Sequence, residues 1–172
     1  EMCIRDRTDT PPEAVGVGVQ KYFDISDLKN SKKVILLENI RDLGNLGTIL
    51  RSAVAFDADG VILYGNCADL YSPKCVRSAV GNLWKIPVVY MDKLGSNFDD
   101  FQRVATLPRT ENLLKKFRPK EKILLMFGSE ADGLSQELIN YSTDSVKIEM
   151  AETVESLNLS VSCAVMMYEI FI

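Results

Sequence analysis

Short, uninterrupted apolar runs are the sequence feature that most limits how this chain can fold. Residues 34–37, 61–64 and 123–127 are such runs, each four or five residues long. Runs of this length are typical of strands that are covered on both faces of a parallel sheet. Between the first two runs, residues 46–56 place apolar side chains at helical spacing (i, i+3, i+4 and i+7). This β–loop–α–β succession predicts an α/β fold, a parallel sheet flanked by helices.

The remaining segments can be assigned by the same local rules. Asn45, Ser72 and Ser135 stand where helix N-caps are expected, and Pro73 suits a first helical position. A single helical turn is expected within residues 25–33. Further strands are predicted over residues 14–19, 86–90 and 145–150, and helices over residues 73–81, 97–103, 112–120, 136–141 and from the polar cluster at 156–160 to about 168.

The composition is that of an ordinary globular protein and predicts one domain. Hydrophobic residues make up 47% and charged residues 26% of the 172 residues. No apolar run approaches the roughly 20 residues that cross a bilayer, and Glu169 interrupts the most apolar helix. The net charge of −4 gives no overall attraction for a phosphate backbone, so a nucleic-acid role needs a local basic patch. Residues 1–10 read as a leader or linker remnant, and residues 11–172 as the folded domain.

The chain contains no histidine, which removes the commonest general base near neutral pH. Ser/His/Asp and Cys/His nucleophile systems and zinc sites with histidine ligands are excluded on the same ground. Four cysteines occur without C-x-x-C spacing, so we expect free thiols in a reducing cytoplasm and no metal site.

Three predicted strand ends are followed by polar loops rich in glycine, asparagine or serine, at residues 39–51, 128–134 and 148–158. Ligands gather at the carboxyl ends of parallel strands, so these loops are candidate site segments. Neither G-x-G-x-x-G nor a Walker loop is present, which leaves dinucleotide and P-loop binding without a phosphate cradle. For the last loop the simpler interpretation is a helix N-cap, since Ser156, Asn158 and Ser160 are favoured there.

Together the three loops resemble the motifs of the SpoU-type (TrmH family) RNA 2′-O-ribose methyltransferases of the SPOUT class. The first motif is Asn39-Ile40-Arg41-Asp42-Leu43-Gly44-Asn45-Leu46-Gly47-Thr48-Ile49-Leu50-Arg51-Ser52-Ala53, the second is Phe127-Gly128-Ser129-Glu130-Ala131-Asp132-Gly133-Leu134, and the third is Ile148-Glu149-Met150 with Ser156-Leu157-Asn158-Leu159-Ser160. They occur in the family's order and cover the chain from about Pro12. Departures at Leu43-Gly44, Ser52 and Asp57 remove no functional side chain.

The resemblance implies a C-terminal deep trefoil knot, S-adenosylmethionine as methyl donor, and a homodimer with the active site at the subunit interface. It also implies an RNA substrate, ribosomal more than transfer RNA, and an upstream RNA-binding domain that this sequence does not show. By position it implies three groups of residues: Asn45, Arg51, Glu130, Ser156 and Asn158 as catalytic; Gly128, Ile148 and Leu157 as cofactor contacts; and Arg41, Lys74 and Arg77, with Lys85, as RNA contacts.

Two other functions remain open at this point. A non-catalytic, dimeric RNA-binding or assembly module of the same fold would need no such set of polar side chains. A nucleotide-binding oxidoreductase lacks its glycine fingerprint. Surface charges balanced by nearby acids are an equally simple reading of Lys74 and Lys85, and the basic run at residues 115–120 is more typical of a solvated face.

Overall fold

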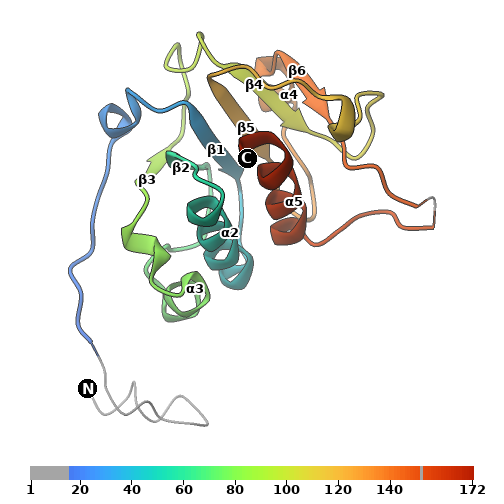
Figure 1. Cartoon of the computed structure of the whole chain (residues 1–172). Coiled ribbons are helices and arrows are strands. Elements are labelled where there is room, and N and C mark those ends of the chain that lie inside the picture. The colour runs from blue at the N-terminus through green and yellow to red at the C-terminus, as the bar shows by residue number, and fades with distance from the viewer. Residues whose placement is uncertain (1–15, 152) are drawn as a thin grey trace.

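The computed structural model describes residues 16–151 and 153–172. Its centre is a six-stranded, wholly parallel sheet with the strand order β3-β2-β1-β5-β4-β6 (Figure 1). The α/β fold with a flanked parallel sheet is therefore confirmed. The strands are β1 (Lys33–Glu38), β2 (Gly60–Tyr64), β3 (Val88–Met91), β4 (Gln102–Thr106), β5 (Ile123–Phe127) and β6 (Asp144–Val146).

Helices cover both faces of the sheet, as the continuous apolar strands require. The helices are α2 (Leu43–Ala55), α3 (Pro73–Ala79), α4 (Gln136–Tyr141) and α5 (Leu159–Phe171), with 3-10 turns η1 (Ile25–Leu28), η2 (Asn82–Trp84) and η3 (Leu114–Lys116).

The two faces have separate cores because alternate strand residues point to opposite sides. Ile35 and Leu37 of β1 pack with α2, α3 and α5, and Val34 and Leu36 pack with α4 and η1. In Figure 1, α2, α3 and α5 lie together on one side of the sheet. The C-terminal helix is held there by Cys163, Met167 and Phe171, which are buried in the first core.

Four local predictions are wrong or too long. Residues 16–19 of the predicted first strand are extended but unpaired, and residues 14 and 15 lie outside the described residues. Residues 97–103 are turns followed by β4 instead of a helix, and residues 112–120 hold only η3. The strand predicted over 145–150 ends at Val146. The final helix starts at Leu159, inside the polar cluster from which it was predicted, and Asn158 is its N-cap.

The N-cap of α2 is Asp42, three residues before the predicted Asn45. The Asp42 carboxylate accepts a hydrogen bond from the backbone N–H of Asn45 at 2.7 Å. Asn45 therefore lies inside the first helical turn, and its side chain is free for other contacts. The predicted caps Ser72 and Ser135 do stand at the starts of α3 and α4, although only Ser135 makes a side-chain cap bond.

Candidate active site

The three candidate loops meet at the carboxyl edge of the sheet. All six strands are parallel, so β1, β5 and β6 end on the same side, and β5 lies between β1 and β4. Leu37 pairs with Phe127 in the sheet, which places the 39–42 and 128–134 loops next to each other. The sheet's winding also reverses between β1 and β5, and open α/β sheets bind ligands at such a reversal.

A hydrogen-bonded chain of three polar side chains joins these loops. Asn158 donates from Nδ2 to Asn45 Oδ1 at 3.1 Å, and Asn45 donates from Nδ2 to Glu130 Oε1 at 2.6 Å. The three residues come from the starts of α5 and α2 and from the loop after β5. The structure thus brings together three of the five residues expected to be catalytic.

The start of α5 sets the donor-to-acceptor direction of the hydrogen bonds that link Asn158, Asn45 and Glu130. Asn158 is its N-cap, and Asn158 Oδ1 accepts from the backbone N–H groups of Ser160 at 2.9 Å and Val161 at 3.4 Å. A backbone N–H can only donate, so the Asn158 amide must turn its nitrogen towards Asn45. The Asn45 amide is oriented in turn, and Glu130 is left as the acceptor at the end.

A cavity of about 700 Å³ opens beside this chain of side chains. Its wall includes Glu130, Ser156 and Asn158 from the catalytic set. The three expected cofactor contacts, Gly128, Ile148 and Leu157, all line it as well. The wall also contains Thr106 at the end of β4 and the next two residues, Leu107 and Pro108. The sequence did not predict this contribution, because β4 was not recognised as a strand.

Gly128 is required by the tight closure of its loop. A Cβ atom at Gly128 would lie 1.9 Å from the carbonyl carbon of Gly133, closer than any real side-chain contact. The loop is closed by Gly133, whose N–H donates to the carbonyl of Ser129 at 3.0 Å and whose φ is +69°. Both glycines therefore keep the loop narrow enough to present backbone groups to the cavity.

Arg51 and Ser156 do not join the hydrogen-bonded chain. Arg51 is exposed on α2, about 9 Å along the helix axis from Asn45 by the helical rise. Its side chain forms no hydrogen bond or ion pair within residues 16–151 and 153–172, and it does not line the cavity. Ser156 lies on the cavity wall, exposed, without a hydrogen-bond partner in the same described part of the chain.

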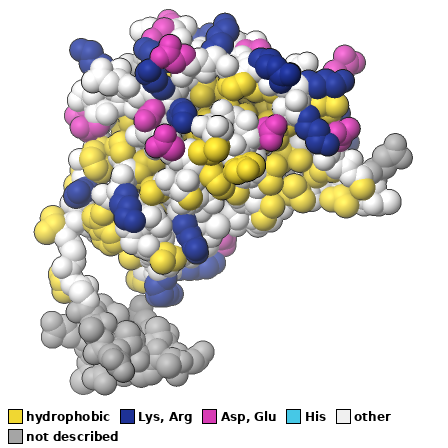
Figure 2. Space-filling model, in the orientation of Figure 1, with side chains coloured by type: hydrophobic (Ala, Val, Ile, Leu, Met, Phe, Trp, Pro, Cys, Tyr) yellow, Lys and Arg dark blue, Asp and Glu magenta, His cyan; other side chains and the backbone are white. Residues whose placement is uncertain are grey.

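Of the expected RNA-contacting cations, Lys74 and Arg77 belong to α3, and Arg41 lies just before the N-cap of α2. Figure 2 shows Lys and Arg side chains over the part of the surface formed by α2 and α3. Lys74 contacts Asp42 at 3.1 Å, whereas Arg41 and Arg77 are exposed without an ion-pair partner among the described residues. The backbone N–H of Asn45 and the Lys74 ammonium hold the pKa of the Asp42 carboxyl below its usual value. Lys74 is thus partly neutralised, and Arg41, Arg77 and Lys85 are the freer charges.

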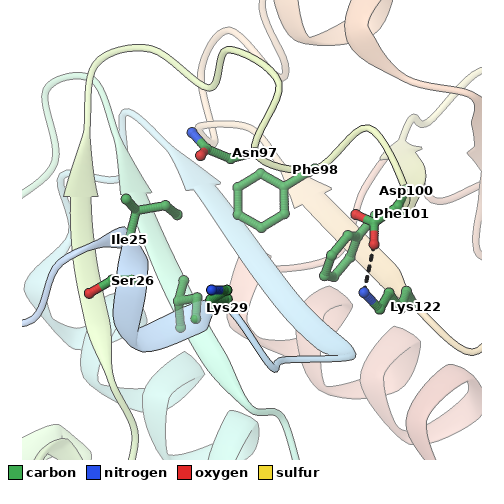
Figure 3. A pocket seen from close by; sticks show the side chains of 9 residues that line it. Ile25, Ser26, Lys29, Asn97, Phe98, Asp100, Phe101 and Lys122 are labelled. Atoms are coloured by element: carbon green, nitrogen blue, oxygen red, sulfur yellow. Dashed lines mark hydrogen bonds and ion pairs between the residues drawn. The ribbon is translucent and has the colours of Figure 1, made fainter.

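A second, smaller hollow lies at the opposite edge of the sheet, near the starts of the strands (Figure 3). Its volume is about 250 Å³, and its walls come from η1, the 97–101 turn and the residue before β5. The ammonium of Lys122 pairs there with the Asp100 carboxylate at 2.6 Å.

Three further properties of the described residues concern metal ligands, cysteine thiols and helices that could span a membrane. They contain no group of three or more His, Cys, Asp or Glu side chains arranged to hold a metal ion. Cys67, Cys75 and Cys163 are free thiols, and burial raises the pKa of Cys75 to about 11. In the same part of the chain, no helix has the length and apolar character needed to span a bilayer.

Comparison with known proteins places this geometry in a family. The model of the SpoU rRNA Methylase family matches residues 32–168. An uncharacterized tRNA/rRNA methyltransferase of Synechocystis is 34% identical over 94% of this chain and 61% of its own length. A 23S rRNA (uridine(2479)-2′-O)-methyltransferase of Streptomyces viridochromogenes is 30% identical over 98% of this chain and 63% of its own length.

A solved structure with bound cofactor is also similar. The SpoU methyltransferase AviRb of Streptomyces viridochromogenes, in complex with AdoMet, superposes with a TM-score of 0.75 at 31% identity. That comparison covers 81% of this chain and 56% of AviRb. The chain thus spans less than two thirds of these relatives. Because the family model matches most of its length, the chain belongs to the SpoU rRNA methylase family.

Proposed function

We propose that this chain is the catalytic domain of an enzyme that methylates a ribose 2′-hydroxyl of RNA with S-adenosylmethionine as the donor. The observation that carries the proposal is the cavity of about 700 Å³ whose wall holds Gly128, Ile148 and Leu157 beside the Asn158–Asn45–Glu130 chain. The RNA is ribosomal or transfer RNA, and we favour ribosomal RNA because the 23S rRNA enzyme is among the relatives.

The residues of the cavity suit this cofactor. Gly128 leaves room that a Cβ would fill, so backbone groups of the 128–134 loop can approach an adenosine closely. Apolar walls from Ile148 and Leu157 suit the adenine ring. S-adenosylmethionine, when bound, supplies an electrophilic methyl group. The chain must then align the ribose hydroxyl and stabilise its oxygen as negative charge develops.

Glu130 and the two amides have defined parts in this proposal. Glu130 Oε1 is held by Asn45, and no group of the described residues donates to Oε2. The free oxygen can orient the ribose hydroxyl or take its proton. Without histidine, the other acceptors are water and the substrate's own phosphate. The Asn158 amide holds Asn45, so it supports Glu130 from the start of α5.

Arg51 acts on the phosphate in this scheme. A guanidinium stays protonated, so it serves as a bidentate clamp and a stabiliser of the developing alkoxide rather than as a base. We expect Arg51→Lys to lose most turnover while keeping S-adenosylmethionine affinity. Turnover near the wild-type rate would show that no bidentate clamp operates.

We further propose that two copies associate through α5 and complete each other's sites. Along this helix Val161, Val165, Tyr168 and Ile172 are 47%, 40%, 60% and 74% exposed, at the spacing of one helical face. Figure 2 shows apolar side chains over this region. The opposite face of α5 is already buried in the core, so this stripe suits a second copy. Arg51 forms no hydrogen bond or ion pair with Asn45, Glu130 or Asn158 of its own protomer, and in this arrangement it would reach the partner's site.

A complementation experiment tests the shared site. Arg51→Ala and Asn158→Ala protomers should each have little activity as homodimers. Mixing them creates one site with both side chains intact if Arg51 acts across the interface. We expect activity to recover in the mixture. If Arg51 acts within its own protomer, the mixture stays inactive, and the shared-site proposal is wrong.

The central test of the function measures cofactor binding first and the methylated RNA product second. Calorimetry should show binding of S-adenosylmethionine and none of NAD, and ribose-methylation mapping of cellular RNA should lose one site when the full-length gene is deleted. Absence of cofactor binding would favour a non-catalytic RNA-binding module of the same fold. A deep C-terminal knot, which the family resemblance implies, is part of the proposal and should make unfolding and refolding slow.

A further inference from the structure

One buried carboxylate at the carboxyl edge lies outside the chain of side chains described above. Glu38 is the last residue of β1 and is 4% exposed. It is the only carboxylate side chain that is buried in the described part of the chain. A buried carboxylate is costly unless it is hydrogen-bonded, so its partner shows what it does.

The partner of Glu38 is a backbone group far away in sequence. Glu38 Oε2 accepts a hydrogen bond from the backbone N–H of Ser135 at 2.7 Å. Ser135 is the N-cap of α4, and its own hydroxyl accepts from the backbone N–H of Leu138 at 3.3 Å. The bond therefore ties the residue where the 128–134 loop ends to the central strand β1.

The tied loop is a wall of the large cavity. It leaves β5 at Phe127, which pairs with Leu37 of β1 in the sheet. Internally it is closed by the bond from Gly133 N–H to the carbonyl of Ser129. The start of the loop is thus held by the sheet, and its middle is held by the internal bond between Gly133 and Ser129. Its end, at Ser135, is held by the carboxylate of Glu38.

We propose that Glu38 is a positioning residue that keeps the 128–134 loop in the shape that receives the adenosine of S-adenosylmethionine. The inference rests on the proposed function and adds a residue that acts only through the loop, since Glu38 does not line the cavity. A loop that binds through its backbone must be ordered before binding, because ordering it on binding reduces affinity. The hydrogen bond from the backbone N–H of Ser135 to Glu38, at 2.7 Å, supplies that order at the last end of the loop.

A second hydrogen bond to α4 offers a matched control. The buried phenol of Tyr64, which pairs with Glu38 in the sheet, donates to Glu137 Oε1 at 2.9 Å. Tyr64→Phe therefore removes a hydrogen bond between the same sheet edge and the same helix. The acceptor of this bond is Glu137 inside α4, so the end of the 128–134 loop is not affected. We expect it to change cofactor affinity by less than about twofold, since the loop end stays tied.

The experiment compares three changes at Glu38 by calorimetry with S-adenosylmethionine and by amide hydrogen exchange. Glu38→Ala removes the acceptor, and Glu38→Asp keeps the charge but shortens the reach by one methylene. Both should weaken binding, the first by about tenfold or more, and speed exchange at Ser135. Glu38→Gln keeps an acceptor oxygen, so binding should stay within about threefold of wild type.

The outcomes separate the inference from the function on which it rests. If wild-type protein binds S-adenosylmethionine and both Glu38→Ala and Glu38→Asp bind equally well, the positioning role is wrong. If Glu38→Gln binds S-adenosylmethionine as weakly as Glu38→Ala does, the charge of Glu38 and not its hydrogen bond to Ser135 supports binding. That result would also overturn the inference. If wild-type protein fails to bind S-adenosylmethionine, the proposed function is wrong. Independently of that result, unchanged amide exchange at Ser135 in a folded Glu38→Asp variant would show that Glu38 does not hold the end of the loop.

Discussion

The two edges of the sheet use polar side chains in opposite ways. At the carboxyl edge, Asn45, Glu130 and Asn158 bond one to the next between segments that are 85 and 113 residues apart. At the amino edge, the polar groups are exposed ion pairs such as Lys122 with Asp100 and Lys32 with Glu121. The carboxyl edge borders the large cavity, and the amino edge borders the small one in Figure 3.

The difference shows how a site can be distinguished from ordinary surface polarity. An exposed ion pair is worth little, because solvent and salt screen it and both side chains lose freedom. A row of hydrogen-bonded amides that begins at a helix N-cap has a fixed donor-to-acceptor direction, since each amide nitrogen can only donate and each amide oxygen can only accept. Changes at the two edges should therefore differ sharply in their effects on activity.

The largest expected effect is at Asn158. Asn158→Ala should lower the single-turnover rate of methyl transfer by about a hundredfold or more, because both Asn45 and Glu130 lose their support. Its cost in unfolding free energy should be only about 1 kcal/mol, as for a lost N-cap. Asn158→Asp is the control, because it keeps the cap and loses the donor to Asn45. An active Asp variant would show that the amide chain has no catalytic part.

Gly128 should give the next largest effect. Gly128→Ala forces the 128–134 loop open, because the new Cβ would overlap the Gly133 carbonyl. We expect a loss of about 1 to 3 kcal/mol in unfolding free energy and at least about tenfold in S-adenosylmethionine affinity. Gly16→Ala, where a Cβ meets nothing within 4 Å, is the control and should be neutral. Unchanged affinity in Gly128→Ala would mean that this loop does not contact the cofactor.

Tyr64 gives a smaller, pH-dependent effect at the carboxyl edge. Burial and the bond to Glu137 raise the pKa of Tyr64 to about 12 from the usual 10. A pKa raised by folding adds stability that is complete below pH 10 and is lost between pH 10 and about 12. Thermal unfolding across that range should show a steeper fall for wild type than for Tyr64→Phe. Parallel curves would indicate that the phenol ionises normally.

The smallest effect is expected at the amino edge. Lys122→Ala breaks the exposed pair with Asp100 and should change the melting temperature by no more than about 1 °C, with methyl transfer unaffected. A loss of activity in this variant would remove the contrast between the two edges and would assign a role to the small hollow.

Sequence patterns found the parts of the fold that are locally determined. The buried strands β1, β2 and β5 follow from uninterrupted apolar runs, and α4 begins at Gln136 with Ser135 as its N-cap, as predicted. β4 was missed because Phe98 and Phe101 have helical spacing. The structure instead buries both rings from a turn, where they contact each other edge to face at 5.1 Å.

Other misses depend on contacts that no local pattern contains. The Val–Gly alternation before residue 20 resembles a strand, but residues 16–19 have no neighbouring strand, and Val19 instead offers its carbonyl to Trp84 Nε1 at 3.3 Å. Asn45 and Asp42 are both good N-caps, and only the three-dimensional bond between them decides which one caps. Glu38 follows an apolar run and reads as the start of a loop, so its burial was not predicted.

The candidate site was assembled from motifs rather than from local pattern. Loops at three strand ends indicated where ligands gather, and the family resemblance then supplied individual residues. The structure groups Asn45, Glu130 and Asn158 and puts Gly128, Ile148, Ser156 and Leu157 on one cavity. Arg51 stands apart, because one chain alone does not contain the contact that we propose for it.

The bond between Asn45 and Asn158 has a consequence for synthesis on the ribosome. These residues are 113 positions apart, so the first half of the site emerges from the exit tunnel long before the second. Until α5 has been translated and docked, Asn45 and Glu130 lack the support of Asn158, and the cavity lacks one wall. A nascent polypeptide that has not yet reached α5 therefore holds an incomplete site.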